Sequence, residues 1–150
     1  MSLQEKVMTE LKAAMRAKDA VKLEALRAIK SGILLAQTEN GSKEEISEDA
    51  ELKLLQKLVK QRKDSAVIYT EQNREDLAKP ELEQAAVIEQ FLPAQLSEEE
   101  IEAKVKEIIA KTGAEGMKDM GKVMGMASQE LAGKADGKTI SMIVKRELSN

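Results

Sequence analysis

The stretch that decides the fold is Phe91-Leu92-Pro93-Ala94-Gln95-Leu96, which interrupts a chain otherwise patterned as helices. Pro93 has no backbone N–H and disfavours the helical conformation at Leu92. Directly after it, Ser97-Glu98-Glu99-Glu100 has the pattern of a capping box, which opens a new helix. We therefore expect two helical domains, residues 1–92 and 93–150.

Two helices are expected at the start of the chain. Ser2 and Glu5 form a first capping box, and that helix should end near Lys18. Asp19 can cap a second helix, which Asn40-Gly41 ends with residues that tolerate left-handed backbone geometry. The apolar row is Leu3, Val7, Leu11 and Met15 in the first helix, and Leu23, Leu26, Ile29, Ile33 and Leu34 in the second.

Two further helices should complete the first domain. Ser47 opens a long helix that frays near Asn73, and a shorter helix begins at about Pro80, because proline is accepted at a first helical position. Arg62 interrupts the apolar row of the long helix, and we favour a partly buried, paired arginine over a ligand contact. The apolar positions are Leu52, Leu55, either Leu58 or Val59, Ala66 and Tyr69 in the long helix and Leu82, Ala85, Ala86 and Ile88 in the shorter one.

Three helices are expected after Pro93. The first follows Ser97 and ends at Gly113, the second spans about Met117 to Leu131 before Gly133, and Asp136 can cap the third. The fold class is therefore all-α, with about four helices followed by a small cluster of three. The buried rows should be Ile101, Val105, Ile108 and Ile109, and later Ile140, Ile143, Val144 and Leu148.

The composition excludes several kinds of site. The 150 residues include no Cys, no His and no Trp, with one Tyr and one Phe. Thiolate nucleophiles, disulfides and zinc sites with nitrogen or sulfur ligands are therefore absent, as is the commonest general base near neutral pH. No motif for nucleotide binding or nucleophilic catalysis is present. We expect no catalytic residues and no cofactor.

The charges suggest neither a metal site nor a dedicated nucleic-acid-binding domain. The formal net charge is -3, and the acidic runs Glu44-Glu45 and Glu98-Glu99-Glu100 lie where helix N-termini favour negative charge. Those runs lack the spacing of a calcium loop, so we interpret them as solvated caps and expect no metal. No apolar run is long enough to span a bilayer, and no signal peptide is evident, so we expect a cytoplasmic protein without a membrane partner.

Glycine, lysine and methionine gather in the last third of the chain. Gly121 and Gly125 lie four apart on one predicted helix face, although Gly costs about 1 kcal/mol relative to Ala within a helix. Either a neighbouring helix or the sugar-phosphate backbone of an RNA could approach them, with Lys118 and Lys122 on the adjoining surface. The methionines could fill the core or form an adaptable binding surface, and we favour the core. They are Met117, Met120, Met124, Met126 and Met142.

The order of several motifs resembles the YqeY family over nearly the whole chain. The motifs are Lys60-Gln61-Arg62 with Asp64-Ser65, Arg74 with Asp76-Leu77-Ala78, Phe91-Leu92-Pro93, Met120-Gly121-Lys122-Val123-Met124-Gly125 and Gly133-Lys134-Ala135-Asp136-Gly137. That family is similar to the tail domain of the GatB subunit of tRNA-dependent amidotransferases, which is also appended to some glutaminyl-tRNA synthetases. The resemblance implies an all-helical N-terminal part, a C-terminal helical cluster like the GatB tail, and a bacterial protein.

The resemblance also implies a role in tRNA handling. It suggests a non-catalytic accessory protein that contacts tRNA through its C-terminal cluster. The alternatives are an adaptor that docks on an aminoacyl-tRNA synthetase or amidotransferase, and the carbon-nitrogen ligase activity with glutamine as amide donor that the family label carries. The positions matching the RNA-facing module of the tail are Lys118, Gly121, Lys122, Gly125, Lys134, Lys138, Lys145 and Arg146.

Overall fold

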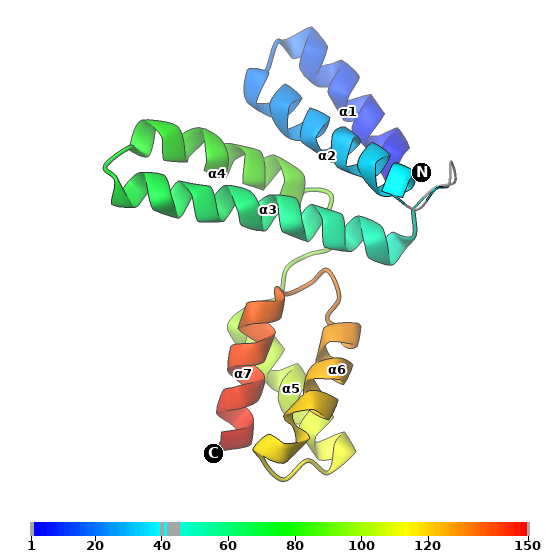
Figure 1. Ribbon diagram of the computed structural model, residues 1–150, viewed down its shortest axis with the longest axis vertical. Coiled ribbons are helices and arrows are strands. Elements are labelled where there is room, and N and C mark those ends of the chain that lie inside the picture. The colour runs from blue at the N-terminus through cyan, green and yellow to red at the C-terminus, as the bar shows by residue number, and fades with distance from the viewer. Residues whose placement is uncertain (1, 40, 42–45, 150) are drawn as a thin grey trace. The chain divides into compact units, whose positions relative to one another are not determined.

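The computed structural model describes residues 2–39, 41 and 46–149, and within them it is all-helical, without a strand. The chain divides into two compact units, Met1–Leu92 and Pro93–Asn150. The first contains the helices α1 to α4 and the second α5 to α7, with a short 3₁₀ helix, η1, before α6 (Figure 1). The predicted all-α class is confirmed.

The first two helices begin as the caps predict. Helix α1 (Leu3–Ala17) has the complete capping box, in which the Glu5 backbone N–H donates to Ser2 Oγ at 3.2 Å. Helix α2 (Ala20–Glu39) begins after Asp19, whose Oδ1 accepts from the Lys22 N–H at 3.1 Å. Of the predicted stop Asn40-Gly41, Asn40 lies outside the described residues, as does the acidic pair Glu44-Glu45, while Gly41 has a left-handed φ of 65°.

Helix α3 (Glu48–Glu71) packs against α4 (Glu75–Glu89). Ser47 caps α3, and Arg62 is half-buried as expected. The Arg62 Nε–H donates to Oε1 of the buried Gln84 at 3.0 Å, and a second guanidinium N–H donates to the Leu58 carbonyl at 3.1 Å. These bonds satisfy a buried amide oxygen that would otherwise be costly, so Arg62 is a structural link between α3 and α4.

The predicted start of α4 was wrong. The helix begins at Glu75, so Pro80 lies inside it rather than at its first position. The first turn contains two acids, Glu75 and Asp76, whose negative charges interact favourably with the positive end of the helix dipole. The Arg74 guanidinium lies 3.0 Å from the Asp76 carboxylate. Pro80 cannot donate a hydrogen bond to the Asp76 carbonyl, and its ring crowds that carbonyl. The favourable interactions at the start of α4 therefore outweigh the cost of a proline inside the helix.

Several residues predicted to be buried are exposed. Leu34 is 50% exposed and Leu82 is 50% exposed, and Ala86 also faces solvent. In α1, Met15 is 56% exposed and Ala14 takes the buried position instead. Helical spacing identifies one side of a helix but not how wide the covered stripe is, which depends on the neighbouring helices. The buried residues of the first core are Leu3, Val7, Leu11, Ala14, Ala25, Leu26, Ile29, Ile33, Leu55, Val59, Ala85 and Ile88.

The second unit is a cluster of three helices around its own core. Helix α5 (Glu98–Thr112) ends at the left-handed Gly113, η1 covers Met117–Asp119, and α6 (Met120–Glu130) is followed by α7 (Gly137–Ser149). Asp136 caps α7, as predicted, by accepting from the Thr139 N–H at 2.6 Å. The core residues are Ile101, Val105, Ile108, Val123, Ala127, Leu131, Ala135, Ile140, Ile143, Val144 and Leu148.

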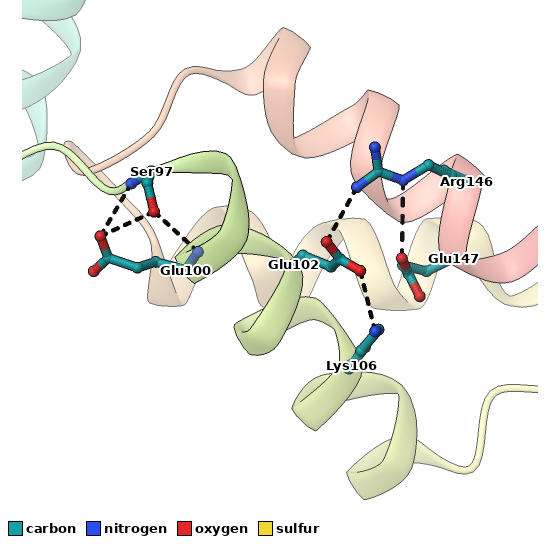
Figure 2. Close-up of polar contacts among 6 residues, drawn as sticks. All are labelled: Ser97, Glu100, Glu102, Lys106, Arg146 and Glu147. Carbon is teal, nitrogen blue, oxygen red and sulfur yellow. Dashed lines mark hydrogen bonds and ion pairs between the residues drawn. The ribbon is translucent and has the colours of Figure 1, made fainter.

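The capping box at the start of α5 gives a first test of the fold (Figure 2). The Glu100 N–H donates to Ser97 Oγ at 3.2 Å, and the Ser97 N–H donates to Glu100 Oε1 at 3.3 Å. We expect Ser97→Ala to lower the free energy of unfolding of the second unit by about 1 kcal/mol, because a helix N-cap is lost. Urea denaturation followed by circular dichroism measures this. Ser128→Ala on the exposed face of α6 is the control, and an equal loss in both variants would contradict the capping role.

Candidate nucleic-acid interface

One surface of the second unit gathers most of the residues that resemble an RNA-facing module. Its position follows from the contact between the start of α6 and the end of α7. The Ser149 hydroxyl at the end of α7 lies 3.6 Å from the Met117 sulfur in η1. Helices α6 and α7 pack against each other, so from this contact they run side by side in opposite directions.

On the α6 side, the exposed face holds glycines and lysines. Gly121 and Gly125 are four residues apart within α6, so they share one face of the helix, and both are exposed. Lys122 and Gly125 are three apart and share the outer face, and both are exposed. Lys118, in η1, is also exposed, and its one ion-pair partner among the described residues is the exposed Glu115, at 3.8 Å.

On the α7 side, the exposed stripe runs back from the same contact. Lys145, Met142 and Lys138 precede Ser149 by four, seven and eleven residues, so they share one helix face. All three are exposed, whereas Ile140, Ile143 and Val144 face the core. We call Gly121, Lys122 and Gly125 of α6, with Lys138, Met142 and Lys145 of α7, the glycine–lysine strip.

The two glycines of the strip are open to solvent. A Cβ atom built on Gly121 or Gly125 would meet no atom within 4 Å outside its own helix. A neighbouring helix therefore does not explain them within the described residues, and this alternative from the sequence was wrong. Gly32 in α2 is a useful contrast, because a Cβ there would lie 2.6 Å from a Leu54 methyl carbon. Packing explains Gly32 but leaves Gly121 and Gly125 unexplained.

The methionines divide between the core and the surface. Met120, Met124 and Met126 pack against the second core, as favoured. Met117 is 44% exposed and Met142 is 60% exposed, so for these two residues the prediction of core filling was wrong. The predicted single helix from Met117 also begins with η1, and α6 proper starts at Met120. The exposure of Met142 was the feature of the strip that the sequence did not reveal.

Two of the remaining candidate residues are not on the helix faces that form the strip. Lys134 is exposed in the connection between α6 and α7, and its carbonyl accepts from the Leu96 N–H at 2.9 Å. Arg146 lies on the flank of α7 that faces α5, where its guanidinium is 3.5 Å from the Glu102 carboxylate (Figure 2). The structure therefore separates Arg146 from Lys145, its neighbour in sequence.

The α5 flank is a network of ion pairs. Glu102 lies 3.0 Å from the ammonium of Lys106, and the hydrogen bond from Lys106 together with its charge holds the pKa of the Glu102 carboxyl below its usual range. The hydrogen bond to Glu102 and its negative charge in turn raise the pKa of the Lys106 ammonium. Arg146 thus already has two acidic partners, Glu102 and Glu147. By contrast, Lys122, Lys138 and Lys145 have no carboxylate partner among the described residues.

Two observations on the described residues concern metal binding and acid catalysis. These residues contain no group of three or more acidic side chains placed to hold a metal ion. The carboxyls with a clear shift are Asp76 and Glu102, and paired cations lower the pKa of both, which is the reverse of what a general acid needs. None of the helices among these residues has the length and hydropathy of a membrane span.

Comparison with known proteins identifies relatives of this chain. A mitochondrial protein of Meyerozyma guilliermondii, named altered inheritance of mitochondria protein 41, is 35% identical over 123 residues, covering 80% of this chain and 64% of its own length. The protein of the same name from Lachancea thermotolerans is 36% identical over 105 residues, covering 68% of this chain and 55% of its own. The chain thus spans less than two thirds of these fungal relatives.

A third relative is longer and has a different kind of name. It is a subunit of the glutamyl-tRNA(Gln) amidotransferase of Thermococcus gammatolerans, which is 40% identical over 73 residues. The match covers 46% of this chain and 12% of that protein. The model of the family described as Yqey-like protein matches residues 4–148, almost the whole chain. This chain therefore belongs to the Yqey-like protein family, which is related to a domain of tRNA-dependent amidotransferases.

Proposed function

We propose that this protein is a non-catalytic accessory protein that binds tRNA through the glycine–lysine strip of its second unit. The observation that carries the proposal is the open space beside Gly121 and Gly125, flanked by lysines without acidic partners among the described residues. A helix face without side chains lets a phosphodiester backbone approach closely, and the lysines can then pair with its phosphates. Such contacts position an RNA without selecting a base.

The name of one relative supports tRNA as the ligand. The Thermococcus relative is named for an amidotransferase of glutamyl-tRNA(Gln), and it shares 73 aligned residues with this chain. A chain of net charge -3 with one Tyr, one Phe and no Trp has little long-range attraction for RNA and few rings on which bases can stack. We therefore propose modest affinity, aided in the cell by an amidotransferase or synthetase partner.

The cytoplasmic and bacterial assignment stays a prediction. The fungal relatives are named as mitochondrial proteins, and they are longer than this chain. Transfer RNA is handled in both compartments, so the proposed binding does not depend on which one applies. The same chemistry is expected in either.

The double variant Lys122→Ala with Lys145→Ala tests the proposed surface. We expect weaker tRNA binding and a logarithmic salt slope smaller by about 1.4–1.8, because two phosphate contacts are lost. Fluorescence anisotropy of labelled tRNA at several salt concentrations measures both effects. The control is Lys104→Ala with Lys111→Ala, which removes the same charge from exposed positions of α5. Equal losses in the two double variants would rule out the strip as the RNA surface.

The alternative function is a protein adaptor that uses the same unit. The observation that favours it is the exposure of Met142, because unbranched thioethers adapt to apolar partner surfaces. An adaptor would bind its synthetase or amidotransferase with little salt dependence, in contrast to tRNA. Saturable, salt-insensitive binding to such an enzyme in the absence of tRNA would therefore favour the adaptor.

A glutamine-dependent carbon-nitrogen ligase activity remains the family-label alternative. Such an enzyme must release ammonia from glutamine and activate a carboxylate. Incubation of the purified chain with glutamine and an ammonia assay tests it directly. Release above the rate of a heat-denatured sample would support this activity.

A further inference from the structure

A groove in the first unit lies outside the proposed RNA surface. It runs between α1 and α2 and has a volume of about 400 Å³, within the range of about 300–1,000 Å³ typical of small-molecule sites. Most of its exposed lining is apolar. The residues that line it are Gln4, Glu5, Val7, Met8, Thr9, Lys30, Ile33 and Leu34.

The floor and walls of the groove are aliphatic. Val7 is 1% exposed and Ile33 is 2% exposed, and both belong to the core of the unit. Leu34 is 50% exposed and Met8 is 37% exposed. Exposing such large side chains to water is unfavourable, at about 25 cal/mol per Å² of apolar surface, so an apolar group that covers them would be stabilised.

The polar groups of the lining differ in what they already bind. The Thr9 hydroxyl donates to the Glu5 carbonyl at 3.0 Å, and a Glu5 carboxylate oxygen accepts from the Ser2 N–H at 3.2 Å. The Thr9 hydroxyl is thus used within α1, and the negatively charged Glu5 carboxylate is held at the N-cap by its bond to Ser2. Lys30 has no carboxylate partner among the described residues, and the helical positions three and four residues away carry no acid. Those positions are Leu26, Arg27, Ile33 and Leu34.

We propose that this groove binds a small amphiphile with an aliphatic body and one anionic group, which pairs with Lys30. The aliphatic body would cover the exposed parts of Met8 and Leu34, and the anion would supply the counter-charge that Lys30 lacks among the described residues. The groove is short, with its lining drawn from residues 4–9 of α1 and 30–34 of α2, which favours a small ligand over a long partner helix. The inference is independent of the RNA proposal.

Decanoate is the probe that tests the proposal on the full chain. With the methionine methyl groups labelled with ¹³C, the Met8 signal reports from inside the groove, and the signal of the more exposed Met142 reports from the other unit. We expect decanoate, below its micelle concentration, to shift the Met8 signal saturably and leave Met142 unchanged. The uncharged decanol should bind about three to five times more weakly, as loss of one exposed ion pair implies.

Matched variants separate the groove from general surface effects. Leu34→Asp should abolish the Met8 shift, whereas Leu35→Asp should not, because Leu35 is 61% exposed and does not line the groove. Lys30→Gln should raise the dissociation constant for decanoate to that for decanol, while Lys22→Gln on the same helix should leave it unchanged.

Four results would overturn the proposal. They are an unchanged Met8 signal, equal shifts of Met8 and Met142, equal affinity for decanoate and decanol, and a Met8 shift on simple dilution of the protein. The second would indicate non-specific adsorption. The last would show that a second copy of the chain covers the groove.

Discussion

Replacing Ile88 by Ala is expected to lower the free energy of unfolding of the first unit by about 2–5 kcal/mol. Ile88 of α4 is fully buried in the core that joins α1, α2, α3 and α4. Its truncation removes apolar surface and leaves a cavity that the surrounding helices fill only in part. Denaturation in urea, followed by circular dichroism, measures the loss.

The control for Ile88 is the same substitution on the surface. Ile68 of α3 is 53% exposed, so Ile68→Ala should change the stability by no more than about 0.5 kcal/mol. The pair also tests the prediction that residues 1–92 and 93–150 are separate domains. If they are, Ile88→Ala should leave the ¹³C-methyl signal of Met142 native at urea concentrations where that of Met8 has become unfolded. Simultaneous loss of both signals would contradict separate domains.

The double variant Gly121→Ala with Gly125→Ala should have opposite effects on stability and on RNA binding. Both glycines lie within α6 in open space, so alanine should stabilise the helix by about 0.5–1 kcal/mol at each position. If a phosphodiester backbone approaches this face, the added methyl groups keep it away. We expect tRNA binding to weaken by about tenfold or more, equivalent to about 1.4 kcal/mol.

The opposite signs make the glycine result informative. A variant that merely damages the fold loses stability and binding together, whereas this one should unfold at a higher urea concentration. Ser128→Ala, an exposed position on the same helix, is the control, because it raises helix propensity without adding a carbon atom. Anisotropy titrations with labelled tRNA measure binding. Unchanged affinity in the double glycine variant would show that RNA does not approach these glycines.

Features that depend on neighbours in sequence were predictable. The caps at Ser2, Ser47 and Ser97 are hydrogen bonds to an N–H three residues later, so the local sequence contains both partners. The left-handed Gly113 is similarly local. The start of α4 was not predictable from Pro80 alone, because the acidic first turn and the Arg74–Asp76 ion pair favour a start at Glu75.

Burial was predictable only in part. Ile29 and Ile33 of α2 are buried as their spacing indicates, but Leu34 has the same chemistry and is half exposed. Hydrophobic spacing gives the direction of a helix face, whereas the width of the covered stripe depends on which helix packs there and how closely. The groove beside Leu34 follows from that packing, and nothing in the sequence marks it.

The sequence by itself determined the all-helical class, the helix caps, the family, and the unusual pair Gly121 and Gly125. These features rest on local hydrogen bonding, on periodicity and on motif order, all of which can be read along one chain. Only the tertiary structure decided that no helix among the described residues covers the glycines, and that Lys145 faces solvent while Arg146 faces Glu102. Adjacent residues on a helix point about 100° apart, so the packing of α5 and α6 around α7 assigns them to different surfaces.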